Sequence, residues 1–278
     1  MAHKWALSVS QDNVAKDMWI KRMSESVFQH FEYSCGAFPS KSESEARMAA
    51  LAPYKADKSI NFTSLHLPFY WGEERPTQTL DFERGICAQR LAHCIEFFAP
   101  LGMKQMTMHA GSVAGNQTRE RGIECVRDVV KFLVPYAEKV GANINVEVCP
   151  RGSIGGVPEE MLAIMDGMPD CVGICFDVNH ANQRYAEVPE WIGKLGKRIN
   201  TFHISDCDEI DECHWVPGVG VLDWKGIMQA INALDHDCLL IYEVSRDGYE
   251  APGFAKREAD PVWFIRTIEK NMEFLKSL

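Results

Sequence analysis

The sequence lacks the features that would mark a membrane, secreted or multidomain protein. No segment approaches the run of about 18 apolar residues that crosses a bilayer, and the N-terminal MAHKWALSVSQDNVAKD has no apolar signal-peptide core. No Pro/Gly/Ser-rich linker, low-complexity segment or long charge run divides the chain. We therefore expect one domain over residues 1–278, a cytoplasmic location and no membrane partner.

Positive charge is also scarce. The 29 Lys and Arg residues stand against 39 Asp and Glu residues, which gives a net charge of −10 over 278 residues. This balance argues against a protein that binds polyanions by electrostatics, so nucleic acid is not expected as a partner. The charge of the whole chain does not describe one face, however, because bound divalent cations would change the sign of an acidic site.

The ten cysteines show no paired spacing typical of zinc sites. They fall mostly singly within apolar runs such as ERGICAQRLAHCIEFF and DCVGICFDVNH, where a free thiol acts as a small apolar side chain. We expect reduced, mainly structural cysteines. Cys149 and Cys207 are weak candidates for soft metal ligands because of their positions near the residues discussed below.

Eight short runs of β-type residues alternate with helical stretches. Residues 119–140 carry apolar side chains at helical spacing and are closed by Gly141, and residues 261–278 do so after Pro261. The β-type runs are 5–9, 30–34, 62–67, 105–109, 144–148, 172–178, 199–204 and 238–244. Eight such alternations predict a closed (β/α)₈ TIM barrel. A doubly wound open sheet is the competing fold, but SVSQDN after the first run lacks its Gly-rich phosphate turn.

The last six predicted strands end in side chains that carry chemistry. Alternate strand residues point into a barrel, and catalytic groups lie at the carboxyl ends of its strands. The residues in phase there are His66, His109, Glu147, Asp177 with His180 in the following loop, His203 and Glu243. Any one of these residues alone would be interpreted as a structural residue whose polar atoms are hydrogen-bonded or solvated. Six consecutive strands that end in such residues indicate a functional site.

Carboxylates that converge at one mouth repel one another unless a cation neutralises them. The sequence therefore predicts a divalent metal site. Mixed carboxylate and imidazole ligands suit Mn²⁺, Zn²⁺, Co²⁺ or Fe²⁺, whereas a purely oxygen shell would suggest Mg²⁺ or Ca²⁺.

The ordered motifs SLHLP, NVEVCP, CFDVNHA, INTFHISD, HWVPGVGVLDWKGI and YEVS resemble the xylose-isomerase-like TIM barrels. This family includes sugar isomerases, sugar-phosphate epimerases, inosose dehydratases and the endonuclease IV class. In its epimerase and isomerase branch, the resemblance implies that one ion is held by Glu147, Asp177, His203 and Glu243. It also implies that Glu147 and Glu243 act as acid and base on opposite faces of a bound ketose.

The physical chemistry of enediolates supports the same roles. A metal that spans a carbonyl and the neighbouring hydroxyl acidifies the C–H between them, and a carboxylate within reach can take that proton. We therefore expect a metal-dependent isomerase or epimerase that acts on a small ketose or related polyol. The sequence leaves the oligomeric state open, and barrels of this family often form dimers or tetramers.

Seven further residues are predicted to bind the substrate, each with a structural alternative. His180 is suited to hold a substrate oxygen, and the resemblance implies that His214 points back into the mouth. Trp71 and Trp215 are suited to form apolar walls for a sugar ring, although core packing is an equal alternative. Glu32 is in phase to bind a hydroxyl, but a structural role is the leading alternative. The full set is His66, His109, His180, His214, Trp71, Trp215 and Glu32.

Three other functions stay open. A lyase or dehydratase that acts on a keto-inositol or 3-keto-glycoside uses the same proton abstraction, and the HxxD spacing of His203 and Asp206 resembles the inosose branch. The family's ketose epimerases often carry an arginine shortly after the strand-7 histidine, and none follows His203 before His214. An abasic-site endonuclease is the second alternative, with Glu212 where an aspartate is usual and no clustered Arg/Lys in the loops. A metal-free sugar-binding or structural barrel is the third.

Overall fold

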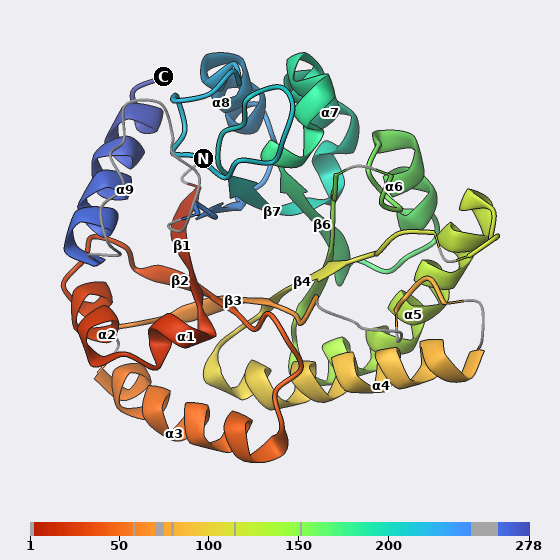
Figure 1. Cartoon of the computed structure of the whole chain (residues 1–278), viewed down its shortest axis with the longest axis horizontal. Coiled ribbons are helices and arrows are strands. Elements are labelled where there is room, and N and C mark those ends of the chain that lie inside the picture. The colour runs from red at the N-terminus through yellow and green to blue at the C-terminus, as the bar shows by residue number, and fades with distance from the viewer. Residues whose placement is uncertain are drawn as a thin grey trace.

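The strands of the chain close into a parallel barrel with helices around its outside (Figure 1). The computed structural model describes residues 3–57, 59–69, 75–78, 81–113, 115–150, 152–245 and 261–278. Each strand pairs with the next in sequence, and β8 returns to pair with β1, with Lys4 opposite Leu239 and Leu7 opposite Tyr242. The predicted (β/α)₈ barrel is confirmed, and the open doubly wound sheet is wrong because β8 leaves no free edge.

The eight predicted β-type runs agree with the observed strands to within two residues at either end. The strands are β1 (Lys4–Ser10), β2 (His30–Ser34), β3 (Phe62–His66), β4 (Gln105–His109), β5 (Asn143–Glu147), β6 (Val172–Asp177), β7 (Ile199–Ile204) and β8 (Leu239–Tyr242). Each begins in the bottom layer of the barrel and ends at the mouth.

The described α-helices form the outer ring. They are α1 (Gln11–Val14), α2 (Asp17–Ser24), α3 (Lys41–Asp57), α4 (Asp81–Phe98), α5 (Arg119–Val140), α6 (Pro158–Met165), α7 (Val188–Leu195), α8 (Trp224–Asn232) and α9 (Pro261–Lys276). Three short 3₁₀ segments are η1 (Ala99–Leu101), η2 (Asn179–Glu187) and η3 (Gly196–Arg198). The predicted helix 119–140 has the observed bounds of α5, because Thr118 accepts the N–H of Arg121 at its start and Gly141 takes a left-handed φ of 61° at its end. No described helix is long and apolar enough to cross a membrane.

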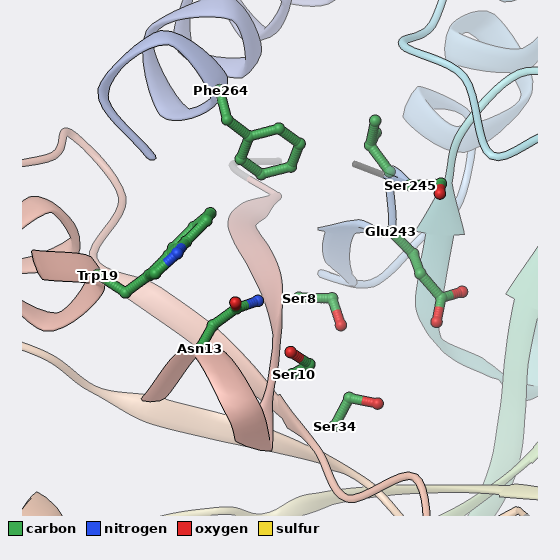
Figure 2. A pocket seen from close by; sticks show the side chains of 9 residues that line it. Ser8, Ser10, Asn13, Trp19, Ser34, Glu243, Ser245 and Phe264 are labelled. Carbon is green, nitrogen blue, oxygen red and sulfur yellow. The ribbon is translucent and has the colours of Figure 1, made fainter. Parts of the chain in front are cut away.

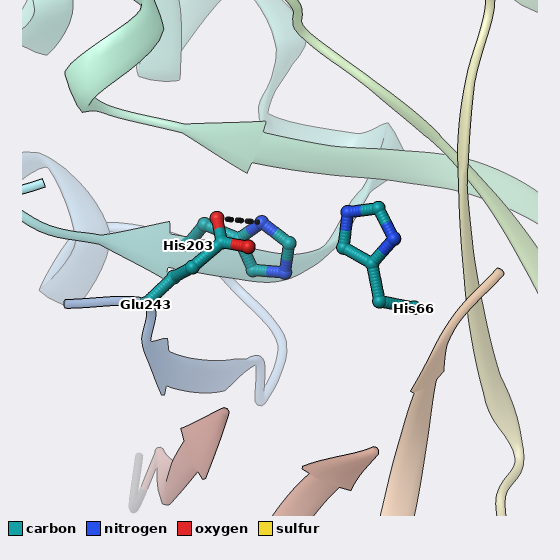
Figure 3. Close-up of side chains that lie close together, drawn as sticks. All are labelled: His66, His203 and Glu243. Atoms are coloured by element: carbon teal, nitrogen blue, oxygen red, sulfur yellow. Dashed lines mark ion pairs between the residues drawn. The ribbon is translucent and has the colours of Figure 1, made fainter. Parts of the chain in front are cut away.

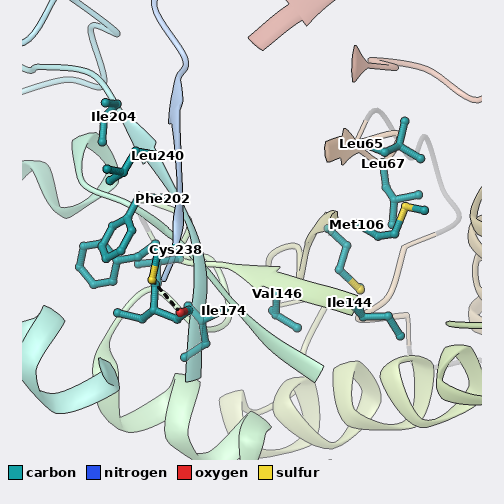
Figure 4. Close-up of a cluster of buried hydrophobic side chains, with 14 of the residues drawn as sticks. Leu65, Leu67, Met106, Ile144, Val146, Ile174, Phe202, Ile204, Cys238 and Leu240 are labelled. Atoms are coloured by element: carbon teal, nitrogen blue, oxygen red, sulfur yellow. Dashed lines mark hydrogen bonds between the residues drawn. The ribbon is translucent and has the colours of Figure 1, made fainter. Parts of the chain in front are cut away.

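The main apolar core lies between the strands and the helices. The outward side chains of the strands are fully buried there, among them Leu65, Met106, Val146, Ile174, Phe202 and Leu240 (Figure 4). Each such side chain contributes about 1.5–3 kcal/mol when it leaves water. Because this core uses the outward positions, the alternate, inward positions are free to carry polar groups.

A bulge in β7 sets the phase of the site. Ile174 of β6 pairs with Ile199, but the next residue, Cys175, pairs with Thr201, so Asn200 is an extra residue in β7. Because a slip of one residue exchanges the two faces of a strand, this insertion decides which β7 side chains face inward. Beyond the bulge, His203 stands opposite Asp177.

The side chain of Asn200 occupies space that a glycine leaves free. Asn200 Nδ2 donates to Asn145 Oδ1 at 2.8 Å, and Asn145 Nδ2 donates to Gln105 Oε1 at 2.9 Å. A Cβ on Gly173 would lie 2.1 Å from Asn200 Nδ2 and 2.9 Å from the carbonyl oxygen of Arg198. Only glycine therefore allows this polar chain beneath the site.

We predict that Gly173→Ala lowers the free energy of unfolding by about 1–3 kcal/mol, because the added methyl group displaces Asn200 from the barrel. Gly193→Ala is the matched control, since a Cβ at this exposed position in α7 meets nothing within 4 Å. That substitution should stabilise the chain by about 0.5–1 kcal/mol through helix propensity. Thermal unfolding of both variants measures the difference, and equal stability of Gly173→Ala and the wild-type chain would contradict the packing described.

Candidate metal centre

Four side chains that are distant in sequence meet at the mouth of the barrel. Glu147 ends β5, Asp177 ends β6, His203 is the last residue but one of β7, and Glu243 directly follows β8. The first three side chains have no exposed surface, and that of Glu243 is 25% exposed. Neighbouring parallel strands end at the same level, which brings the four groups into one cluster.

The ligand atoms of this cluster lie at the spacing of a coordination shell. His203 Nδ1 is 3.0 Å from Glu243 Oε2, 3.1 Å from Glu147 Oε1 and 3.9 Å from Asp177 Oδ2. Figure 3 shows the pair of His203 and Glu243, with the ring of His66 beside it. One ligand atom from each of the four residues lies within 4.8 Å of the others. Metal bonds of about 2.0–2.2 Å to oxygen and nitrogen fit such separations.

Two carboxylate oxygens in the cluster are buried without a hydrogen bond. Among the described residues, Glu147 Oε2 and Asp177 Oδ2 accept no well-directed hydrogen bond, although His109 Nε2 lies 2.9 Å from the first and His180 Nδ1 lies 3.3 Å from the second. An ionised carboxylate buried in this way is costly unless a cation compensates it. The residues present therefore fit a divalent ion, and three carboxylates with one imidazole suit Mn²⁺, Zn²⁺, Co²⁺ or Fe²⁺.

The charges of the cluster oppose one another when no metal is bound. Burial raises the pKa of Asp177 well above its usual value, and the neighbouring carboxylates Glu243 and Glu147 add to this. Burial acts in the same direction on Glu147, but electrostatic attraction and hydrogen bonds from His109 and His203 outweigh it and hold its pKa well below the usual value. Burial would lower the pKa of His203, yet the surrounding acidic groups raise it well above 6.5.

Two histidines from β3 and β4 flank the other side of Glu147. Its Oε2 lies 3.2 Å from His66 Nε2 and 2.9 Å from His109 Nε2. Burial opposes protonation of His66, but Glu147 raises its pKa to about 9, whereas burial prevails at His109 and lowers its pKa. Phe69 packs on both rings, at centroid distances of 4.9 and 5.1 Å. These residues close one wall of the mouth.

A third group lies on the opposite side, around His180. Its Nδ1 donates to the carbonyl of Val148 at 2.9 Å, and its Nε2 is 3.4 Å from Glu212 Oε2. His214 takes a positive φ of 48° and donates from Nδ1 to the carbonyl of Glu243 at 3.1 Å. Its ring lies 5.6 Å from that of His180. His180, Glu212 and His214 have ligand atoms within 4.8 Å of one another, as do His66, His109 and Glu147.

Asp206, two residues beyond β7, organises the loop rather than the metal cluster. It is fully buried, and its two carboxylate oxygens accept the N–H groups of Cys207, Gly218 and Leu222 and the indole N–H of Trp224. The HxxD spacing of the sequence thus has a structural explanation here. This carboxylate fixes the turn that carries His214 back to the mouth.

None of the ten cysteines, all of which lie within the described residues, forms a disulfide. Burial raises the pKa of Cys149 well above its usual value and that of Cys207 to about 11, so both thiols keep their protons near neutral pH. The Sγ atom of Cys149 lies within 4.8 Å of one ligand atom of Glu147 and one of His180. Its role as a soft ligand stays a weak prediction because a metal would first have to displace the thiol proton.

Three predicted substrate-binding residues remain, namely Trp71, Trp215 and Glu32. Trp71 lies outside the described residues. Trp215 exchanges two backbone hydrogen bonds with Asp206, at 2.8 and 3.0 Å, and its partly exposed ring follows His214. Glu32 has no exposed surface and lies beneath His203. That burial does not support the contact with substrate that we expected for Glu32.

A cavity next to Glu243 adds residues that the sequence analysis did not select (Figure 2). It has a volume of about 220 Å³ and is lined by Ser8, Ser10, Asn13, Trp19, Ser34, Glu243, Val244, Ser245 and Phe264. The signal for part of this set is present in the sequence, because Ser8 and Ser10 alternate in β1 and Ser34 is in phase with Glu32 in β2. We selected residues by reactive chemistry, so these small hydroxyl side chains were missed.

The family model of xylose isomerase-like TIM barrels matches residues 21–277, so the chain belongs to this family. No curated protein matches its sequence. Among solved structures, a D-tagatose 3-epimerase-like protein is similar at a TM-score of 0.77 and 20% identity, over 99% of this chain and 98% of its own. An L-ribulose 3-epimerase has a TM-score of 0.76 and 16% identity, over 99% and 96%. A 3-keto-D-glucoside 4-epimerase from E. coli has a TM-score of 0.73 and 16% identity, over the full length of both chains. At these identities the similarity shows the fold.

We predict that Mn²⁺ binding at pH 7 releases at least one proton per ion. His203 and Asp177 have raised pKa values in the metal-free protein, and a metal needs the Nδ1 lone pair of the first and the ionised carboxylate of the second. Affinity should therefore rise with pH. Isothermal titration in two buffers with different ionisation enthalpies measures the released protons, and a binding enthalpy independent of the buffer would contradict this charge distribution. His203→Asn serves as the control that should release fewer protons.

Proposed function

We propose that the protein is a divalent-metal-dependent isomerase or epimerase acting on a small, uncharged ketose or related polyol. The observation that carries this proposal is the cluster of Glu147, Asp177, His203 and Glu243 beside a cavity lined by hydroxyl groups. It unites a cation site, two carboxylates suited to proton transfer and a space for a sugar.

The two glutamates divide the proton transfers. When bound, the metal would polarise the substrate carbonyl and the adjacent hydroxyl and so acidify the C–H between them. One glutamate enters the reaction ionised and takes this proton, which leaves an enediolate. The other enters protonated and gives its proton to the opposite face, which inverts the carbon, and proton exchange with solvent restores both groups. Return by the same residue to the neighbouring carbon would instead move the carbonyl. In the free protein, His109 and His203 keep the pKa of Glu147 low against burial, and His203 and His214 do the same for Glu243. Either carboxylate is therefore ionised and can act as the base.

The cavity supports an uncharged substrate. Its described polar lining consists of serine hydroxyls and the Asn13 amide, and none of its described lining side chains carries a positive charge. Trp19 and Phe264 supply apolar surface on which a sugar carbon skeleton can pack (Figure 2). The Glu243 carboxylate at its inner end would repel a phosphate group. Solved structures with this fold include two sugar 3-epimerases and a 3-keto-D-glucoside 4-epimerase, which agrees with this substrate class.

Solvent deuterium uptake tests the proposal. We expect the Mn²⁺-loaded protein to exchange the C3 or C4 proton of a ketose or 3-keto-glycoside from a panel that also includes inososes. Glu147→Gln and Glu243→Gln should each lower the exchange rate by about 10²–10⁴-fold, because each removes an acid or base. Mass spectrometry of the recovered sugar measures the exchange, and an unsaturated product would indicate elimination instead.

Asp177→Asn separates ligation from proton transfer. It removes a ligand without an assigned acid or base, so saturating Mn²⁺ should restore much of its exchange. The same concentration should leave Glu147→Gln and Glu243→Gln impaired. Full recovery of both glutamine variants at saturating metal would contradict their acid and base roles.

Hydrolysis of an abasic-site phosphodiester is the second candidate. The observation that favours it is that ligand groups other than the central four residues lie around the mouth, among them His66, His109 and Glu147 and also His180, Glu212 and His214. The acidic loop between His203 and His214 argues against it, since it contains no Lys or Arg that would contact phosphates.

Metal content and nicking separate the two candidates. We predict one tightly bound ion per chain and no cleavage of an abasic duplex. Three ions per chain, measured by elemental analysis, together with nicking that is lost in His180→Asn, would replace the epimerase proposal with the endonuclease.

A further inference from the structure

Glu32 is a buried carboxylate that the proposed reaction does not use. It is the third residue of β2, and the register places Ser8 of β1 on one side of it and Ser64 of β3 on the other. Ser8 Oγ donates to Glu32 Oε1 at 3.0 Å, and Ser64 Oγ donates to Glu32 Oε2 at 2.8 Å. The side chain has no exposed surface. Two serines therefore provide hydrogen bonds to both oxygens of a carboxyl group in the interior of the barrel, where an unsatisfied polar group would be costly.

The third partner of Glu32 is a candidate metal ligand from across the barrel. His203 Nε2 lies 3.2 Å from Glu32 Oε1 and 3.3 Å from Glu32 Oε2. The other ring nitrogen, Nδ1, faces Glu147 and Glu243. The imidazole thus separates the buried carboxylate from the proposed metal site.

His203 differs in this respect from three other histidines around the mouth. His66, His180 and His214 each donate from Nδ1 to a backbone carbonyl, that of Leu67, Val148 and Glu243 respectively. His203 depends on a side chain instead. An ionised carboxylate only accepts hydrogen bonds, so it requires the proton on Nε2 and leaves the Nδ1 lone pair for a cation.

We propose that Glu32 is a positioning residue that fixes the tautomer and ring orientation of His203 for metal binding, and that it does not contact the substrate. This inference rests on the proposed function, because it takes His203 as a ligand. The serines on either side keep the carboxylate aligned with the ring. Ser8 also lines the cavity next to Glu243, so the wall of the proposed substrate site and the support of the metal ligand share one residue.

Glu32→Gln tests the proposal with little change in shape. The glutamine amide can donate a hydrogen bond to Nε2, which allows the tautomer that carries its proton on Nδ1 and cannot bind a metal there. We expect the Mn²⁺ affinity, measured by isothermal titration, to fall by about 10–100-fold. Glu32→Asp keeps the charge and should recover part of the affinity. Glu25→Gln, the same change at an exposed glutamate paired with Arg22, should leave it unchanged.

The ring itself provides a readout that a merely structural role would not move. In the Zn²⁺-loaded wild-type protein, ¹⁵N NMR should show His203 protonated at Nε2, and Glu32→Gln should lose or reduce that signal. Wild-type affinity together with an unchanged Nε2–H signal in Glu32→Gln would overturn the proposal. If Glu32→Gln does not fold, the wild-type spectrum decides, and a Zn²⁺-loaded wild-type protein in which His203 carries no proton on Nε2 would overturn the proposal.

Mn²⁺ titration of His203→Asn distinguishes a failure of the proposed metal site from a failure of the proposed role of Glu32. If the wild-type protein binds Mn²⁺ and His203→Asn weakens that binding, the metal site stands whatever Glu32 does. If His203→Asn binds Mn²⁺ as tightly as the wild type, the proposed metal site fails and the role of Glu32 fails with it.

Discussion

The structure depends on the meeting of three carboxylates in a place that water hardly reaches. Glu147 and Asp177 are fully buried, and Glu243 is exposed over a quarter of its side chain. Negative charges this close repel one another, and burial adds to the cost of each. Histidines compensate some of this charge, but two carboxylate oxygens still lack a hydrogen bond within the described part of the chain. A divalent cation held between these groups would resolve the conflict, and it would connect the acidic composition with the proposed chemistry.

The barrel produces this arrangement through its geometry. Its outward strand residues form the apolar core with the helices, so its inward residues at the mouth can be polar without loss of that core. Two features of the barrel interior below the mouth support the site. The extra residue Asn200, accommodated by Gly173, keeps His203 opposite Asp177, and Glu32 then meets the far side of the His203 ring. The reactive groups are therefore held by rigid strands, whereas Asp206 fixes the loop that returns His214.

The sequence predicts much of the barrel and of the cluster at its mouth, because the periodicity of apolar residues shows which side chains of a strand or helix share a face. Strand alternation correctly predicted eight strands and the convergence of Glu147, Asp177, His203 and Glu243, and the spacing of apolar residues with Gly141 predicted α5. Periodicity does not give depth, which depends on the stagger of strands around the barrel. Glu32 is in phase with the site, so we included it among the candidate substrate-binding residues beside a leading structural alternative, but it lies beneath His203. The bulge at Asn200 and the positive φ of His214 arise from contacts between distant segments, and no local pattern encodes them.

The central claim is that Glu147, Asp177, His203 and Glu243 together hold a divalent ion. Anomalous diffraction at the manganese edge, from crystals of the Mn²⁺-loaded protein, tests it most directly. We expect one strong anomalous peak between these four side chains, adjacent to the cavity lined by Ser8 and Ser34. No peak at that position in metal-loaded crystals, or a peak only at His180, Glu212 and His214, would contradict it.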